Sequence, residues 1–171
     1  MKKMKPQKIK ITFVCTGNTC RSAMAESVLR HELKKRKLSD KFTISSAGLY
    51  VKEGEDMNPT AKIALKNNKI SPHRHRAKVL TETAVKRATV LVCMTSEHKE
   101  RVNSDKAFTV AEITGGNDVY DPFGLGVEAY ERTLKYLIYA CDDIINFAQK
   151  LADKKREQEV VKSATEEDII T

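Results

Sequence analysis

The residues best suited to chemistry form the segment Cys-Thr-Gly-Asn-Thr-Cys-Arg-Ser at positions 15–22. This segment follows an apolar, β-branched stretch and precedes residues with helical spacing. Gly17 permits a tight turn in which successive backbone N–H groups point inward, and the start of the helix adds positive potential at the same place. The pattern therefore predicts a loop that binds a dianionic phosphate group.

Cys15 is the candidate nucleophile at the bottom of this loop. The loop amides, the helix end and Arg21 favour the thiolate, which is the reactive form of cysteine. The planar guanidinium of Arg21 suits two phosphate oxygens and can follow their charge into a transition state. We expect Ser22 to hydrogen-bond the sulfur and Asn18 to lock the loop. The alternative is a structural cysteine before a capped helix, which the strand–loop–helix context disfavours.

Asp121, in the segment Asp121-Pro122-Phe123-Gly124, is the candidate general acid. A leaving group needs a proton, and a separate carboxylic acid is a usual source. Pro122 stiffens the segment, and Phe123 offers an apolar wall beside a substrate. An ordinary Asp-Pro turn is the alternative, but the Cys-x5-Arg loop elsewhere in the chain favours the acid. A Walker-type nucleotide loop is excluded because the chain has no Gly-Lys-Ser/Thr sequence.

Strands and helices that alternate along the chain must position these residues. The candidate strands are residues 9–15, 42–48, 88–94 and 107–110. Helical spacing begins near Ser22 and Pro59, and again for a last helix from about Val127 to Leu151. This alternation predicts an α/β fold, with a parallel sheet covered by helices on both faces. Ligands bind such sheets at the C-terminal ends of strands, where Cys15 stands.

The 171 residues suit one domain. We divide the chain into a basic N-terminal segment 1–8, a domain 9–151 and a charged tail 152–171, which we expect to be frayed or disordered. The net charge of +8 suits anionic substrates, and its patterning does not indicate nucleic-acid binding. No apolar stretch is long enough to span a bilayer, and no signal peptide is recognisable, so we expect a cytoplasmic protein without a membrane partner.

The remaining cysteines and histidines are less promising. In a reducing compartment the cysteines at 15, 20, 93 and 141 are expected to be thiols, with Cys93 and Cys141 in the core. His73 and His75 lie in a basic segment without an obvious acidic or cysteine partner. We expect a solvated loop there, and no metal site.

Several motifs resemble the low-molecular-weight protein phosphatase family over roughly residues 9–150. They are Val14–Ser22, Met24-Ala25-Glu26, Ser46-Ala47-Gly48 and Asp121–Gly124. The resemblance implies one three-layer domain with a four-stranded parallel sheet of order 2-1-3-4, no metal and no cofactor. It implies phosphorylated proteins as substrates, inorganic phosphate as product and inhibitor, and a monomer. One departure is Ala23, where many members have proline.

The resemblance also assigns roles to residues. Cys15 would form the phosphocysteine, Arg21 would clamp the phosphate, and Asp121 would act as acid and then as base for the hydrolytic water. The expected substrate-binding residues are Thr16, Gly17, Asn18, Thr19, Cys20, Ser22, Tyr50 and Phe123. Cys20 matches the family's second loop cysteine, which implies a reversible disulfide with the nucleophile.

Thr19 bears on the substrate. Members that act on phosphotyrosine usually carry isoleucine there, whereas a bacterial subgroup with threonine resembles the protein-arginine phosphatases, and Tyr50 and the Asp-Pro-Phe segment match it too. We therefore expect phosphoarginine, with phosphotyrosine as the alternative. Arsenate reduction would need two further cysteines close together, which the chain lacks. A non-catalytic phosphate-binding module would not need Cys15, Arg21 and Asp121 together.

Overall fold

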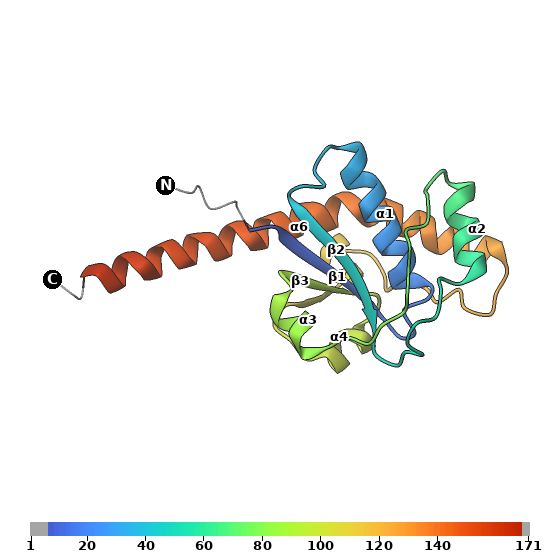
Figure 1. Cartoon of the computed structure of the whole chain (residues 1–171), viewed down its shortest axis with the longest axis horizontal. Helices are drawn as coiled ribbons and strands as arrows, with labels where there is room; N and C mark the ends of the chain where they lie inside the picture. The colour runs from blue at the N-terminus through green and yellow to red at the C-terminus, as the bar shows by residue number, and fades with distance from the viewer. Residues whose placement is uncertain (1–6, 169–171) are drawn as a thin grey trace.

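The computed structural model of the chain describes residues 7–168, which build a central parallel sheet (Figure 1). Its strands are β1 (Ile9–Cys15), β2 (Phe42–Gly48), β3 (Val90–Cys93) and β4 (Ala107–Thr109). They lie in the order β2-β1-β3-β4, and every pairing is parallel. The predicted order is confirmed, although β3 and β4 are shorter than the predicted strands.

Helices cover both faces of the sheet. They are α1 (Arg21–Lys35), α2 (Pro59–Asn67), α3 (Glu82–Arg87), α4 (Ser96–Val102), α5 (Val110–Thr114) and α6 (Val127–Asp168). Helices α1, α2 and α6 pack together on one side of the sheet, while α3 and α4 lie on the other side (Figure 1). Both faces of β1 are therefore buried: Phe13 belongs to the larger core under α1 and α6, and Val14 to a smaller core on the opposite face.

Three short helices were not predicted from the sequence. Helices α3, α4 and α5 have six, seven and five residues, too few to display a helical period. Each begins at a threonine whose side chain accepts a hydrogen bond from a backbone N–H of the first turn: Thr81, Thr95 and Thr109. Their caps, more than an apolar stripe, mark where they start.

The C-terminal tail is helical, which corrects the expectation of a frayed segment after Leu151. Helix α6 continues to Asp168 as 42 residues. No glycine or proline interrupts residues 152–168, and ion pairs such as Lys155–Glu159 join successive turns. Arg156 also donates to the backbone oxygen of Gln7, so the helix contacts the start of β1. The predicted segment 1–8 falls mostly outside the described residues, as do residues 169–171.

The C-terminal ends of β1 and β2 lie side by side, with Cys15 paired to Gly48. The loop after β1 and the start of α6 meet at this edge, where Cys20 contacts Tyr130. Over residues 7–168, the fold contains no helix that is both long and apolar enough to cross a membrane.

Candidate active site

The loop between β1 and α1 turns at Asn18. This residue has a φ of 58°, in the left-handed region that asparagine tolerates better than most residues. Gly17, which the sequence suggested as the turning residue, does not have a positive φ. The turn ends where α1 begins at Arg21, so the positive end of that helix faces the loop.

Asn18 is fully buried and fixes the loop from beneath. Its side-chain nitrogen donates to Ser22 Oγ and to Ser46 Oγ, both at 2.9 Å, and its side-chain oxygen accepts from the backbone N–H of Lys78. Ser22 Oγ in turn lies 2.8 Å from Cys15 Sγ. Both predicted contacts are present: Ser22 reaches the sulfur, and Asn18 locks the loop.

Gly48, at the end of β2, allows the loop to lie this close to the sheet. A Cβ atom at this position would lie 2.5 Å from the backbone oxygen of Thr16, a clash that backbone atoms cannot relieve cheaply. The same oxygen accepts hydrogen bonds from the backbone N–H groups of Leu49 and Tyr50. The glycine thus lets the segment after β2 support the loop directly.

Arg21 and Asp121 meet although they are far apart in the chain. Arg21 Nη2 lies 3.2 Å from Asp121 Oδ2, and Arg21 Nη1 donates to the backbone oxygen of Val119 at 3.4 Å. The arginine side chain is buried, whereas that of Asp121 is 53% exposed. The backbone N–H of Phe123 donates to Asp121 Oδ1, which fixes the carboxylate. The two contacts fix the guanidinium of Arg21 beside the loop, where it can bind an anion, whereas the carboxylate of Asp121 remains accessible to solvent.

A cavity of about 320 Å³ opens above the loop. It is lined by Cys15, Thr16, Gly17, Asn18, Thr19, Cys20, Arg21, Tyr50, Lys52, Glu55, Asp121 and Phe123. Ten of these were singled out in the sequence, and Ser22, the remaining one, lies behind Cys15. Lys52 and Glu55, which form an ion pair of 3.4 Å, were missed because nothing in their local sequence indicates a site. The aromatic rings of Tyr50 and Phe123 are exposed.

All four cysteines are free and buried. Burial raises the pKa of Cys93 and of Cys141 to about 12, as expected for core thiols. Cys20 differs because it lines the cavity and lies 3.4 Å from the hydroxyl of Tyr130. Burial raises the pKa of Cys20 as well.

A histidine from α4 supports the first residue of the loop. His98 Nε2 lies 2.9 Å from Thr16 Oγ1, and His98 Nδ1 lies 2.9 Å from Thr95 Oγ1. Burial and the nearby Arg21 lower the pKa of His98 to about 4. Sequence patterns gave no sign of this residue, because α4 was not recognised as a helix.

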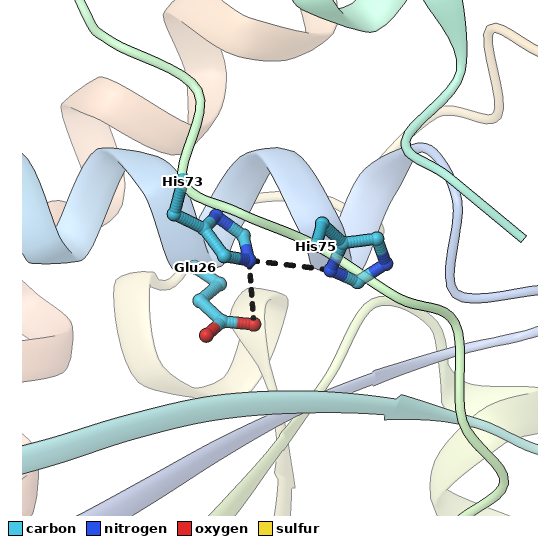
Figure 2. A group of neighbouring side chains, drawn as sticks. All are labelled: Glu26, His73 and His75. Carbon is cyan, nitrogen blue, oxygen red and sulfur yellow. Dashed lines mark hydrogen bonds and ion pairs between the residues drawn. The ribbon is translucent and has the colours of Figure 1, made fainter. Parts of the chain in front are cut away.

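The expectation of a solvated loop at His73 and His75 is wrong. His75 is buried and its Nε2 lies 2.6 Å from the backbone oxygen of Asn18. An acidic partner is present too: His73 Nε2 lies 3.2 Å from Glu26 Oε2 (Figure 2). Glu26 belongs to α1, whereas both histidines belong to the segment that crosses it, so the local sequence could not show the pair.

The parallel sheet, the amide-rich loop and the cysteine–arginine pair together define a small α/β phosphatase. Residues 10–158 match the family described as low molecular weight phosphotyrosine protein phosphatase. The chain belongs to this family, and it is a protein phosphatase, a hydrolase.

Relatives of both substrate types are similar to the chain. A protein-arginine-phosphatase of Geobacillus stearothermophilus is 34% identical, covering 85% of this chain and 95% of that protein. A low molecular weight protein-tyrosine-phosphatase of Staphylococcus haemolyticus is 33% identical, and the match covers 77% of this chain and 94% of that protein. A solved structure of the YwlE arginine phosphatase, a cysteine-to-serine mutant with a phosphorylated active site serine, is 33% identical with a TM-score of 0.76, covering 86% and 99%.

Proposed function

We propose that the protein dephosphorylates phosphoarginine in proteins through a phosphocysteine at Cys15. The observation that carries the proposal is the presence of Thr19 in the cavity wall. A polar threonine suits a cationic guanidinium better than it suits a phenyl ring. The similarity to a protein-arginine-phosphatase over nearly that protein's whole length supports the same substrate.

In the first step, the Cys15 thiolate attacks the phosphorus atom, the S–P bond forms and the P–N bond of phosphoarginine breaks. Arg21 leaves Asp121 to hold two phosphate oxygens, and the loop amides hold the third. Asp121 gives its proton to the departing guanidine nitrogen. The phosphorylated serine in the related cysteine-to-serine structure supports the nucleophile's position, since a phosphoryl group resides there in that protein.

In the second step, a water molecule attacks the phosphorus of the phosphocysteine. Asp121, now a carboxylate, takes a proton from this water, the S–P bond breaks, and inorganic phosphate leaves with the Cys15 thiolate restored. The partial exposure of Asp121 supports this role, because the water must reach the carboxylate. The hydrogen bond from Ser22 stabilises the sulfur as it departs.

Phosphotyrosine is the second candidate substrate. The exposed rings of Tyr50 and Phe123 flank the cavity, and aromatic walls favour a phenyl group. The similarity to a tyrosine phosphatase of Staphylococcus haemolyticus agrees with this alternative.

The two candidates are separated by kcat/KM on matched phosphoarginine and phosphotyrosine peptides. We expect the natural chain to prefer phosphoarginine. Thr19→Ile should shift the ratio of the two kcat/KM values toward phosphotyrosine by about 10-fold or more, the range expected for a small change in pocket chemistry. Thr83→Ile, in the exposed part of α3, is the matched control and should leave the ratio unchanged. A natural preference for phosphotyrosine would refute the substrate while leaving the mechanism intact.

A further inference from the structure

Three potential metal-ligand side chains converge behind the phosphate-binding loop, on the side away from the cavity. Glu26 comes from α1, and His73 and His75 come from the segment that crosses this helix (Figure 2). One ligand atom of each lies within 4.8 Å of the ligand atoms of the other two. Among the residues that the structure describes, no other group of three histidine, cysteine or carboxylate side chains has the spacing of a metal site.

The ring nitrogens of the histidines point toward one another in a defined way. His75 Nε2 faces the backbone oxygen of Asn18, which is only an acceptor, so this nitrogen must carry a proton and donate it. The tautomer that carries its proton on Nε2 presents a lone pair on Nδ1. That lone pair lies 3.2 Å from His73 Nε2.

The carboxylate adds a third candidate ligand beside the two imidazoles. Glu26 Oε2 lies 3.2 Å from His73 Nε2, and the same carboxylate accepts hydrogen bonds from Ser46 and Arg30. Without a cation, the three atoms share a single proton, carried by His73 Nε2. A metal ion among these three atoms would replace that proton and take all three as ligands.

The spacing suits a small divalent cation. Zinc ligands about 2.0–2.1 Å from the ion in a tetrahedral site lie roughly 3.3 Å apart, close to the two observed separations of 3.2 Å. Two imidazoles and a carboxylate form a zinc-type ligand set, with water as the fourth ligand. The outer ring nitrogens already have partners, since His73 Nδ1 lies 2.7 Å from Ser27 Oγ and His75 Nε2 donates to Asn18.

We propose that Glu26, His73 and His75 bind one zinc-class divalent ion that supports the phosphate-binding loop from behind. Binding moves the proton of the neutral His73 ring from Nε2 to Nδ1, which then donates it to Ser27 Oγ. The ion then connects two chain segments that hold Asn18: His75 through the backbone oxygen, and Glu26 through Ser46. It has no place in the chemistry at Cys15, and the site does not depend on which phosphorylated residue is the substrate.

The test is a titration of the full-length, chelator-treated chain with Co²⁺, a visible-light probe for zinc sites. We expect one ion per chain with ligand-field bands of nitrogen and oxygen donors, and competition by Zn²⁺. His73→Asn should weaken Co²⁺ binding by at least about 10-fold, because it removes a direct ligand. Asparagine retains a polar atom near the position of Nδ1, which preserves the contact with Ser27. His31→Asn, on the same helix as Glu26, is the matched control and should bind like the natural chain.

A second measurement on the natural chain does not depend on any variant. Proton NMR of the Co²⁺-loaded protein should show two hyperfine-shifted, solvent-exchangeable resonances from the outer N–H groups of the two histidines. Three results would overturn the proposal: absence of Co²⁺ binding, equal binding by His73→Asn and the natural chain, or a thiolate-to-cobalt charge-transfer band. The last would place the ion on the cysteines of the loop. In each case the cluster would serve as a hydrogen-bonded support alone.

Discussion

At the scale of single residues, the loop depends on a chain of buried hydroxyl and amide groups. Ser22 contacts the Cys15 sulfur, Asn18 contacts Ser22, and Ser46 joins Asn18 to the carboxylate of Glu26, with Ser46 Oγ donating at 2.6 Å. Every buried side-chain polar atom within the described residues has a hydrogen-bond partner. Because unpaired buried polar groups are costly, each member of this network holds its neighbours in one arrangement.

Asp121 provides a test of the general-acid step. We expect Asp121→Asn to lower kcat by about 10²–10⁴-fold for phenyl phosphate, because the amide cannot donate the proton that a basic leaving group needs. The loss should be smaller for para-nitrophenyl phosphate, whose leaving group needs little protonation. The asparagine oxygen can still accept from Phe123, so the loop should keep its shape.

The matched control is Asp118→Asn. Asp118 lies near Asp121 but accepts hydrogen bonds from Ser96 at the start of α4 instead of lining the cavity. The kcat of the Asp118→Asn variant should stay within about twofold of that of the natural chain for both substrates, because surface changes away from a site usually have small effects. An equal loss for both leaving groups in Asp121→Asn would contradict the assignment of the acid.

Cys20 provides a test of redox protection. Peroxide is expected to convert the Cys15 thiolate to a sulfenic acid, and attack by Cys20 sulfur would then form a disulfide with loss of water. Activity of the natural chain should return after treatment with dithiothreitol, whereas Cys20→Ser should recover less because the sulfenic acid proceeds to sulfinic acid. The extent of reactivation is measured by an activity assay, and the oxidation state of Cys15 by the mass of the peptide that contains it. Cys141→Ala is the control and should recover like the natural chain. Equal recovery in Cys20→Ser would contradict the idea.

Most of the cavity could be predicted from residue types because its chemistry is local. Cys15, Arg21 and the loop between them are contiguous, and the Asp-Pro segment is a recognisable motif. Contacts between distant segments could not be predicted in this way. His98 contacts Thr16 from a short helix that the sequence pattern did not reveal. Glu26 contacts His73 because a segment much later in the chain crosses α1.

At the scale of secondary structure, the short helix α4 connects the sheet to the phosphate-binding loop. Thr95 caps this helix and contacts His98 Nδ1, so the cap and the histidine that reaches Thr16 form one unit. The imidazole is held neutral by burial and by Arg21, while Glu97, Asp118 and Asp121 act weakly in the opposite direction. A proton on His98 would therefore disfavour the native position of α4.

The free energy of unfolding should consequently fall as the pH decreases from about 6.5 to about 4. In this window the unfolded chain binds a proton on His98, whose ordinary pKa is 6.5, while the folded chain, with a pKa of about 4, does not. His98→Gln should reduce the dependence of the free energy of unfolding on pH. The glutamine side chain cannot titrate, but it can still reach Thr16. Urea unfolding at a series of pH values measures the effect. A slope that is the same in both proteins would contradict it.

The strands and long helices were predictable because they repeat a pattern over many residues. Apolar periodicity located β1, α1 and the start of α6. The three short helices depend on single capping threonines, which are common in loops too. The end of α6 was misjudged because residues after Leu151 lack an apolar stripe, although their strong helix formers and charge pairs suffice to continue a helix already anchored at Ala152 and Arg156.

At the scale of the whole molecule, α6 extends beyond the α/β body. At 1.5 Å per residue its 42 residues span about 63 Å, more than the diameter of a small domain. Its first turns lie beside the loop, where Tyr130 contacts Cys20, and its later turns pass the opposite edge of the sheet at Gln7. Figure 1 shows the last turns projecting away from the body.

Removal of residues 160–171 should therefore leave the enzyme intact. Val160 and Val161 are both 66% exposed and belong to the projecting part, so the deletion removes little buried apolar surface. We expect kcat/KM within twofold and a midpoint of thermal unfolding within about 2 °C of the natural chain. Deletion from residue 152 onward is the contrasting case and should lower the midpoint, because it removes Ala152 and the contact between Arg156 and Gln7. A large loss of activity in the shorter deletion would contradict this expectation.

The direction of α6 also determines how the molecule can be attached to other objects. Because α6 runs from the loop at Cys20 past Gln7 at the other end of β1, a fluorophore, a surface linker or a fused domain attached at the last turn of α6 would stand several nanometres from Cys15. The projecting turns would act as a built-in spacer. Immobilised through that end, the phosphatase would present its cavity outward to protein substrates in solution.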